Sequence, residues 1–133
     1  MQQQQGTTVL VVEDSPMFRR MLSDMLQGLG YTRVLEAFSG QAALELLAEQ
    51  KPDLVCLDLT LPDISGYEVC EFIRSSPGLR DVPVLMISAR TQTMDRAQAE
   101  EAGASGYLIK PFTPEELRQQ VDRVMAARPR KEA

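Results

Sequence analysis

Residues 8–16 read TVLVVEDSP, and this stretch predicts a strand, a loop and the beginning of a helix. Thr8–Val12 is a continuous apolar run rich in β-branched residues, which is typical of a strand buried on both faces. The apolar run ends at Glu13. Ser15 is a good N-cap, and Pro16 suits the first helical position because the N–H that it lacks would have no intrahelical partner there. One β-α unit is therefore predicted here.

The same order of strand and helix recurs four more times along the chain. Further strands are predicted at 33–37, 54–59, 84–88 and 106–110. Helices are predicted after Ser39, after Gly66, over 96–102, and from a T-P-E-E capping box at Thr113 to about Ala127. This alternation predicts a doubly wound α/β fold, with a five-stranded parallel sheet between two layers of helices.

Composition excludes several classes of function. The chain has 133 residues, and 14 Lys and Arg against 19 Asp and Glu give a net charge of −5. One domain is expected at this length, and the acidic balance argues against direct binding of nucleic acid. The sequence has no histidine. Ser-His or Cys-His nucleophile pairs, imidazole metal ligands and a histidine phosphate carrier are therefore excluded.

The two cysteines and the hydropathy pattern indicate a cytoplasmic protein. Cys56 and Cys70 have apolar neighbours, and we expect two reduced core thiols rather than a disulfide. No apolar run is long enough to span a membrane, so we expect no membrane insertion. Residues 1–6 lack the basic and apolar regions of a signal peptide.

Polar side chains occupy the predicted carboxyl ends of four strands: Glu13 and Asp14, then Asp58, Ser88 and Lys110. In an open α/β sheet these ends line the ligand crevice. Three carboxylates in one crevice repel one another, so such a cluster normally has a cation or a lysine to offset it. Oxygen ligands without His or Cys favour Mg²⁺, Mn²⁺ or Ca²⁺ over zinc.

Together these groups are equipped for phosphoryl transfer. A divalent cation and Lys110 would neutralise phosphoryl oxygens, and an aspartate can itself be the nucleophile. Each residue alone also has an ordinary structural interpretation, because an Asp after a strand is commonly a turn residue and Ser88 could begin a loop. The joint occurrence at four strand ends favours a functional site.

Four motifs in order identify a family resemblance. They are VVEDS at 11–15, LDLTLPDISG at 57–66, ISAR at 87–90 and YLIKPF at 107–112. On these residues the chain resembles the receiver domain of response regulators, the chemotaxis-receiver family of two-component signalling. The resemblance implies a flavodoxin-like fold with strand order 2-1-3-4-5. It places the receiver domain at residues 8–127, between a disordered segment at 1–7 and a C-terminal tail at 128–133.

The resemblance also implies roles for the acidic residues. Asp58 would be the phosphoacceptor. Asp14 and Asp58 would bind Mg²⁺, or Mn²⁺ as a substitute, through their side chains, with Glu13 assisting through water and Thr60 through its backbone carbonyl. Thr60 and Arg90 flank the phosphoryl site at positions that tune phosphate lifetime in the family.

Three further residues would respond to the phosphoryl group. The resemblance implies that Ser88 and Lys110 each contact a phosphoryl oxygen and that the Lys110–Pro111 peptide is cis. Tyr107 matches the aromatic switch residue of the family. Its inward rotation would reshape the face built by the fourth helix, the fifth strand and the fifth helix.

The implied function is signalling rather than turnover of a separate substrate. A sensor histidine kinase or a phosphotransfer protein would supply the phosphoryl group, and the domain would catalyse its own phosphorylation and dephosphorylation. An output partner would bind the reshaped face. The domain is expected to be a monomer or a dimer that forms on phosphorylation.

Two alternatives remain open from the sequence. An Asp-nucleophile phosphatase of the haloacid-dehalogenase type shares the aspartyl-phosphate chemistry, but it normally carries its nucleophile on the first strand and a second acid where Thr60 stands. An interaction module that works without phosphorylation would not require the complete set of pocket residues.

Overall fold

The computed structural model describes residues 7–89 and 96–127 and contains five β-α units. The elements are β1 (Thr8–Val12), α1 (Pro16–Gly28), β2 (Arg33–Ala37), α2 (Gly40–Glu49), β3 (Leu54–Asp58), α3 (Gly66–Ser75), β4 (Val84–Ala89), α4 (Arg96–Ala102), β5 (Gly106–Lys110) and α5 (Pro114–Ala126). The predicted C-terminal tail, Arg90 and the predicted N-terminal segment apart from Thr7 lie outside the described residues.

The strands form one parallel sheet in the order β2-β1-β3-β4-β5, as predicted. β1 lies between β2 and β3, so the first strand in the chain occupies the interior of the sheet. Its last four residues are almost fully buried, which explains the continuous apolar run in the sequence. β2 is an edge strand and is only partly buried.

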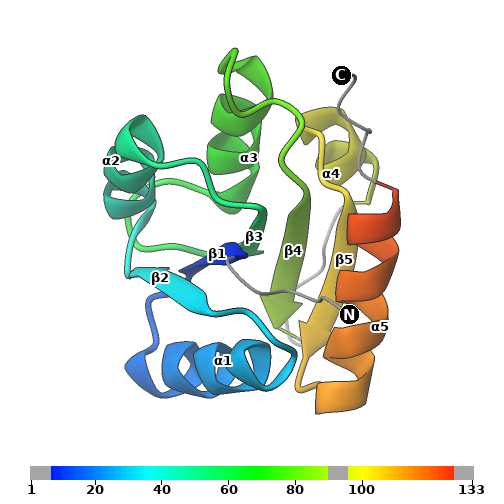
Figure 1. The fold of residues 1–133 in the computed structure, drawn as a ribbon. Coiled ribbons are helices and arrows are strands. Elements are labelled where there is room, and N and C mark those ends of the chain that lie inside the picture. The colour runs from blue at the N-terminus through cyan, green and yellow to red at the C-terminus, as the bar shows by residue number, and fades with distance from the viewer. Residues whose placement is uncertain (1–6, 90–95, 128–133) are drawn as a thin grey trace.

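Helices cover both faces of the sheet (Figure 1). One core cluster joins alternate strand residues to α2, α3 and α4 through side chains such as Leu47, Ile73 and Ala102. The other joins the remaining strand residues to α1 and α5 through side chains such as Leu26 and Val121. This division follows from the alternation of side chains along each strand.

Two strand ends differ by one residue from the sequence-based prediction. β3 ends at Asp58 rather than at 59, although the N–H of Leu59 still donates to the carbonyl oxygen of Ile87 at 2.7 Å. β4 continues to Ala89, which is paired with Lys110 in β5. The sheet ladder therefore extends to the polar residues at its carboxyl edge.

The loop after β3 is held against α2 and α3. The Asp63 carboxylate accepts hydrogen bonds from the backbone N–H groups of Gly40 at 2.9 Å and Gln41 at 2.8 Å, and these bonds hold its pKa below the usual value. A Cβ atom at Gly66 would lie 2.6 Å from the backbone oxygen of Asp58. Only glycine allows α3 to begin so close to the end of β3.

The prediction for the two cysteines agrees with the structure. Cys56 and Cys70 are buried and form no disulfide. None of the helices in the described part of the chain is long and apolar enough to cross a membrane.

Candidate functional site

The carboxyl ends of β1, β3 and β5 bring their charged side chains into one cluster. Oxygen atoms of the Glu13, Asp14 and Asp58 carboxylates all lie within 4.8 Å of one another. Lys110 Nζ lies 3.1 Å from Glu13 Oε1 and 3.7 Å from Asp58 Oδ2. The structure therefore brings together four of the residues that the sequence predicted at this edge.

Glu13 is a buried acid with both carboxylate oxygens engaged. It is 2% exposed, Oε1 accepts from Lys110 Nζ, and Oε2 accepts from the backbone N–H of Ser15 at 3.0 Å. A buried carboxylate requires such partners, because an unpaired charge in the interior is strongly unfavourable. Asp14, the next residue, is exposed and presents its carboxylate at the open side of the cluster.

Asp58 is buried beside another acid, and this raises its pKa. The pKa rises from 3.8 to about 6, first because burial removes the carboxylate from water and second because the Glu13 charge repels it. Lys110 and the backbone N–H of Thr60, 3.3 Å from Asp58 Oδ1, act in the opposite direction. The lysine offsets only part of the charge, so additional positive charge at this position would stabilise the ionised form.

Lys110 is held in place by aromatic side chains as well as by acids. Its Nζ lies 4.3 Å from the centroid of the Phe18 ring, and that ring meets the Phe112 ring edge to face with centroids 5.6 Å apart. The Lys110–Pro111 peptide is cis, as the resemblance implied. Phe18 was not identified from the sequence as a contact of Lys110. The only signal for it in the sequence was its position in the first turn of the helix that follows the Glu13 loop.

Ser88 contributes a hydroxyl with unused hydrogen-bonding capacity. It lies next to the partner of Asp58 in the β3–β4 pairing, which is Ile87. The residue is 1% exposed, and its Oγ has no hydrogen-bond partner in the part of the chain that the structure describes. Buried hydroxyls are nearly always hydrogen-bonded, so this atom is a candidate ligand contact.

Tyr107 lies on the same sheet face as Ser88. It is paired with Met86 across β4 and β5, and directly opposed residues project to the same face. The ring is partly buried and packs against the core cluster beneath α2, α3 and α4. Ser88 and Tyr107 are therefore placed on one face of the sheet, on adjacent strands.

The donor set of the cluster fits a magnesium ion. Glu13, Asp14 and Asp58 offer oxygen atoms only, and they come from the ends of two adjacent strands. Mg²⁺ prefers carboxylate oxygens together with water, and the exposed Asp14 leaves one side accessible to water. Thr60 is exposed beside the cluster, and its backbone carbonyl remains a predicted ligand.

A family model for the response regulator receiver domain matches residues 9–122. This chain belongs to that family. Receiver domains of this kind are parts of two-component systems. The match covers all the predicted site residues, from Glu13 to Lys110.

Relatives and solved structures agree with the assignment. The chain is 41% identical over 109 residues to the DNA-binding response regulator MtrA of Mycolicibacterium smegmatis, covering 82% of this chain and 46% of that protein. It spans about half the length of the curated relatives that it matches. The chemotaxis response regulator CheY4 of Vibrio cholerae aligns with a TM-score of 0.82 at 33% identity, covering 89% of this chain and 98% of that one.

A further similar structure carries a metal. The receiver domain of sensor histidine kinase PA1611 from Pseudomonas aeruginosa aligns with a TM-score of 0.82 at 33% identity, over 92% of this chain and 99% of that one. It is described with a magnesium ion coordinated in its active site cleft. The acidic cluster of the present receiver domain is compatible with such a site.

Proposed function

We propose that this receiver domain accepts a phosphoryl group on Asp58 in a Mg²⁺-dependent reaction and thereby controls a partner. The observation that carries the proposal is the environment of the Asp58 carboxylate. It is nearly buried, lies 3.7 Å from Lys110 Nζ and shares a cluster with two other acids. A purely structural aspartate would not need two further acids and a lysine around it.

In the proposed reaction an Asp58 oxygen attacks the phosphorus atom of a donor. A phosphorus–oxygen bond to Asp58 forms, the bond from phosphorus to the donor breaks, and the donor leaves with the electron pair. Lys110 and Ser88 would each contact a phosphoryl oxygen. Glu13, Asp14, Asp58 and the Thr60 carbonyl would hold the Mg²⁺ ion, which when bound supplies positive charge to the phosphoryl oxygens.

The donor is proposed to be a sensor histidine kinase or a phosphotransfer protein. Membership of the response regulator family supports this proposal, and the domain has no histidine of its own to carry the phosphoryl group. The domain would catalyse phosphoryl transfer to and from its own Asp58, without turnover of a separate substrate. Thr60 and Arg90, which follow Asp58 and Ser88 by two positions in the sequence, are proposed to tune how long the phosphoryl group stays.

Phosphorylation is proposed to act through a pre-existing equilibrium between two conformations. The phosphoryl group adds about −1.5 to −2 charge and strong acceptor oxygens. Ser88, whose hydroxyl is unpartnered among the described residues, would gain a hydrogen bond in one of the two conformations. Tyr107 would follow by turning inward. The surface of α4, β5 and α5, on which Ile109 is 48% exposed, would then bind the output partner.

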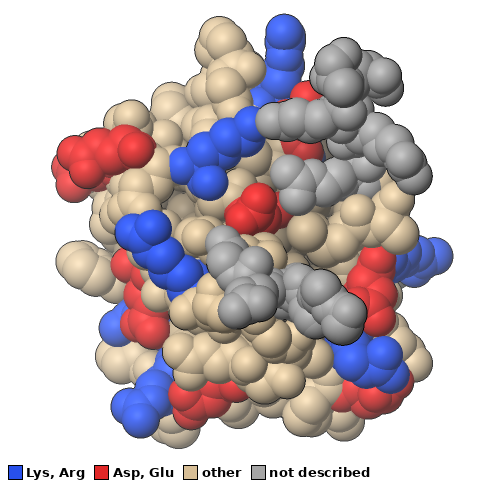
Figure 2. Space-filling model, viewed as in Figure 1, with Lys and Arg blue, Asp and Glu red and all other residues tan. Residues whose placement is uncertain are grey.

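Output is proposed to reside in a partner or in a further part of the protein, not in nucleic-acid binding by this domain. On the face seen in Figure 2, basic and acidic side chains are interspersed and no broad basic surface gathers. MtrA is named a DNA-binding protein, but the chain matches only 46% of its length. The domain would act as a monomer or as a dimer that forms on phosphorylation.

The test is phosphorylation by acetyl phosphate with Mg²⁺, followed by intact-mass spectrometry. Wild-type protein should gain one phosphoryl group, and Asp58→Asn should gain none. Asp122→Asn is the matched control, because Asp122 is an exposed acid on α5 that pairs only with Arg118 among the described residues. Labelling of Asp58→Asn at the wild-type level would contradict the proposal.

Two further measurements separate the two alternatives. Steady hydrolysis of phosphate esters would favour a phosphatase, although Asp58 lies on the third strand and Thr60 stands where that class has its second acid. Amide spectra that do not change when beryllofluoride is added with Mg²⁺ would favour a module that works without phosphorylation.

A further inference from the structure

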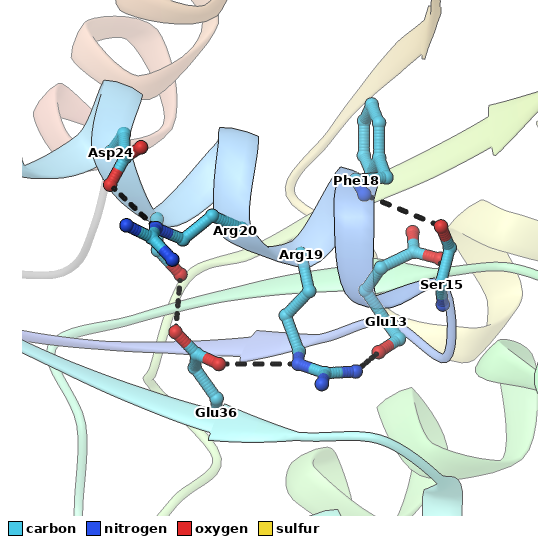
Figure 3. Close-up of polar contacts among 8 residues, drawn as sticks. Glu13, Ser15, Phe18, Arg19, Arg20, Asp24 and Glu36 are labelled. Carbon is cyan, nitrogen blue, oxygen red and sulfur yellow. Dashed lines mark hydrogen bonds and ion pairs between the residues drawn. The ribbon is translucent and has the colours of Figure 1, made fainter.

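Arg19 on α1 contacts the backbone of the acidic cluster from outside the site. Its Nη1 donates to the carbonyl oxygen of Glu13 at 2.8 Å, and its Nε donates to Glu36 Oε1 at 3.2 Å (Figure 3). The side chain of Arg19 is only 18% exposed. One guanidinium therefore links α1, β2 and the loop that follows β1.

Glu36 is itself held at both carboxylate oxygens. Oε1 accepts from Arg19, and Oε2 accepts from Ser23 Oγ at 2.9 Å. Ser23 is buried and lies one turn after Arg19 on α1. Glu36 on β2 is paired with Val11 on β1, and Val11 lies two residues before Glu13. We call Arg19, Glu36 and Ser23 the α1–β2 clamp.

The α1–β2 clamp completes the fixation of the Glu13 backbone. The N–H of Glu13 donates to the carbonyl oxygen of Ala37 at 3.0 Å, and its carbonyl accepts from Arg19. That carbonyl belongs to the peptide unit that leads into Asp14. In the described part of the chain no hydrogen bond or ion pair to the Asp14 carboxylate is seen, so the direction of this side chain depends on its backbone.

We propose that Arg19, held by Glu36, is a positioning residue for the divalent cation site. It fixes the peptide between Glu13 and Asp14, and thereby keeps the exposed Asp14 carboxylate facing the other two. Partners outside the ligand shell that orient the ligands typically change metal affinity by about 10–100-fold. This proposal rests on the proposed function, since it requires that the cluster binds Mg²⁺.

Positioning and simple electrostatics predict opposite signs. Arg19 places a positive charge 2.8 Å from the backbone oxygen of a proposed metal ligand. If charge alone mattered, Arg19→Ala would remove a repulsion and tighten Mg²⁺ binding. If positioning matters more, the same substitution weakens binding. The sign of the change therefore distinguishes the two effects.

Arg20 provides a matched control. It is the next residue on α1, and its only ion pair among the described residues is with Asp24, at 3.6 Å and with side chains 80% and 62% exposed (Figure 3). Arg20→Ala removes the same charge from the same helix without touching the acidic cluster. Its effect on Mg²⁺ binding measures the long-range charge effect alone.

The experiment is a Mg²⁺ titration of the full chain followed by amide NMR. Arg19→Ala should weaken Mg²⁺ binding by about 10-fold, and Arg20→Ala should leave it within about 2-fold. Glu36→Gln keeps an oxygen for Ser23 but loses the charge that attracts Arg19, so a weakening of about 3-fold is expected. In metal-free protein, exchange of the Ser15 amide, which is bonded to Glu13 Oε2, should quicken in Arg19→Ala and not in Arg20→Ala.

The outcomes separate this proposal from the proposed function. Wild-type protein that binds no Mg²⁺ would refute the metal site itself. Wild-type binding with equal or tighter affinity in Arg19→Ala would overturn the clamp proposal alone. Val121→Ala, a core change on α5, controls for lost stability: an equal weakening there would also overturn it. If Arg19→Ala does not fold, Glu36→Gln tests the proposal instead. A Glu36→Gln protein that binds Mg²⁺ as tightly as wild type would contradict the proposal.

Discussion

Charged side chains at the two ends of the sheet differ in how completely their charges and hydrogen bonds are satisfied. At the amino ends of β4 and β5, Arg74 on α3 donates to the carbonyl oxygens of Gly103 at 2.8 Å, Arg80 at 3.0 Å and Val82 at 2.7 Å, and to Ser105 Oγ at 3.1 Å. Every acceptor is neutral, and the arginine joins α3 to the segments that precede both strands. This end is built as a satisfied network.

The carboxyl end is electrostatically unfavourable by comparison. Three acids crowd together, one lysine offsets part of their charge, and a buried serine hydroxyl has no partner among the described residues. Such an arrangement lowers stability until a cation or another ligand supplies the missing partners. Polar groups whose hydrogen bonds are all made stabilise the fold at the amino end. Polar groups whose hydrogen bonds and charges are only partly satisfied indicate the functional site at the carboxyl end.

The largest expected effect comes from removing the lysine of the site. Lys110→Met should slow phosphorylation of Asp58 by acetyl phosphate by about 100-fold, because loss of one electrostatic group at the reacting oxygens typically has an effect of this size. The rate is measured by intact-mass spectrometry at matched Mg²⁺. Lys51→Met, an exposed lysine between α2 and β3, is the control and should react at the wild-type rate. A wild-type rate in Lys110→Met would remove the lysine from the proposed chemistry.

The satisfied end should respond in stability and not in chemistry. Arg74→Ala leaves several carbonyl oxygens without their donor and should lower the free energy of unfolding by about 2–4 kcal/mol. Urea unfolding measures this change. Arg118→Ala, whose contacts are exposed ion pairs on α5, should change stability by less than about 1 kcal/mol. A stable Arg74→Ala protein with lost phosphorylation would reverse the comparison between the two ends.

The smallest loss of stability is expected at Ser88. Because its hydroxyl is buried without a partner in the described structure, Ser88→Ala should not lower the free energy of unfolding and should raise it by up to about 1 kcal/mol. The same variant should weaken the amide shifts that beryllofluoride produces around Tyr107. Ser23→Ala is the contrast, since the buried Ser23 hydroxyl does bond to Glu36, and its loss should destabilise by about 1 kcal/mol. Equal effects of the two substitutions on stability would show that the Ser88 hydroxyl is satisfied after all.

The features predicted from the sequence are those that the backbone determines. Lys110 and Glu13 are 97 residues apart, yet their contact follows from the strand order, because both stand at carboxyl ends of strands in one parallel sheet. The alternation of apolar runs with capped helical patterns was sufficient to predict the order of the strands and helices along the chain. β3 ends one residue before its predicted limit, and β4 continues one residue past its predicted limit because Ala89 still pairs with Lys110.

The features that the sequence did not predict depend on side-chain paths between elements. Arg19 reaches Glu36 across 17 positions and Arg74 reaches Ser105 across 31, and no local pattern distinguishes either arginine from an exposed helical residue. Phe18 against Lys110 is of the same kind. Such contacts require the relative placement of a helix and a strand, which periodicity alone does not give.

Stability of Asp58→Asn against pH, in metal-free protein, tests most directly whether the carboxyl end of the sheet is held in an unfavourable state. Burial and Glu13 raise the Asp58 pKa from 3.8 to about 6, so the ionised carboxylate destabilises the fold above about pH 6. This destabilisation falls as pH falls through 6 and is gone below the unfolded-state pKa. The account predicts that Asp58→Asn is more stable than wild type by about 1–2 kcal/mol near pH 8, with the gain vanishing near pH 4 and shrinking when Mg²⁺ is added. A less stable Asp58→Asn near pH 8 would contradict it.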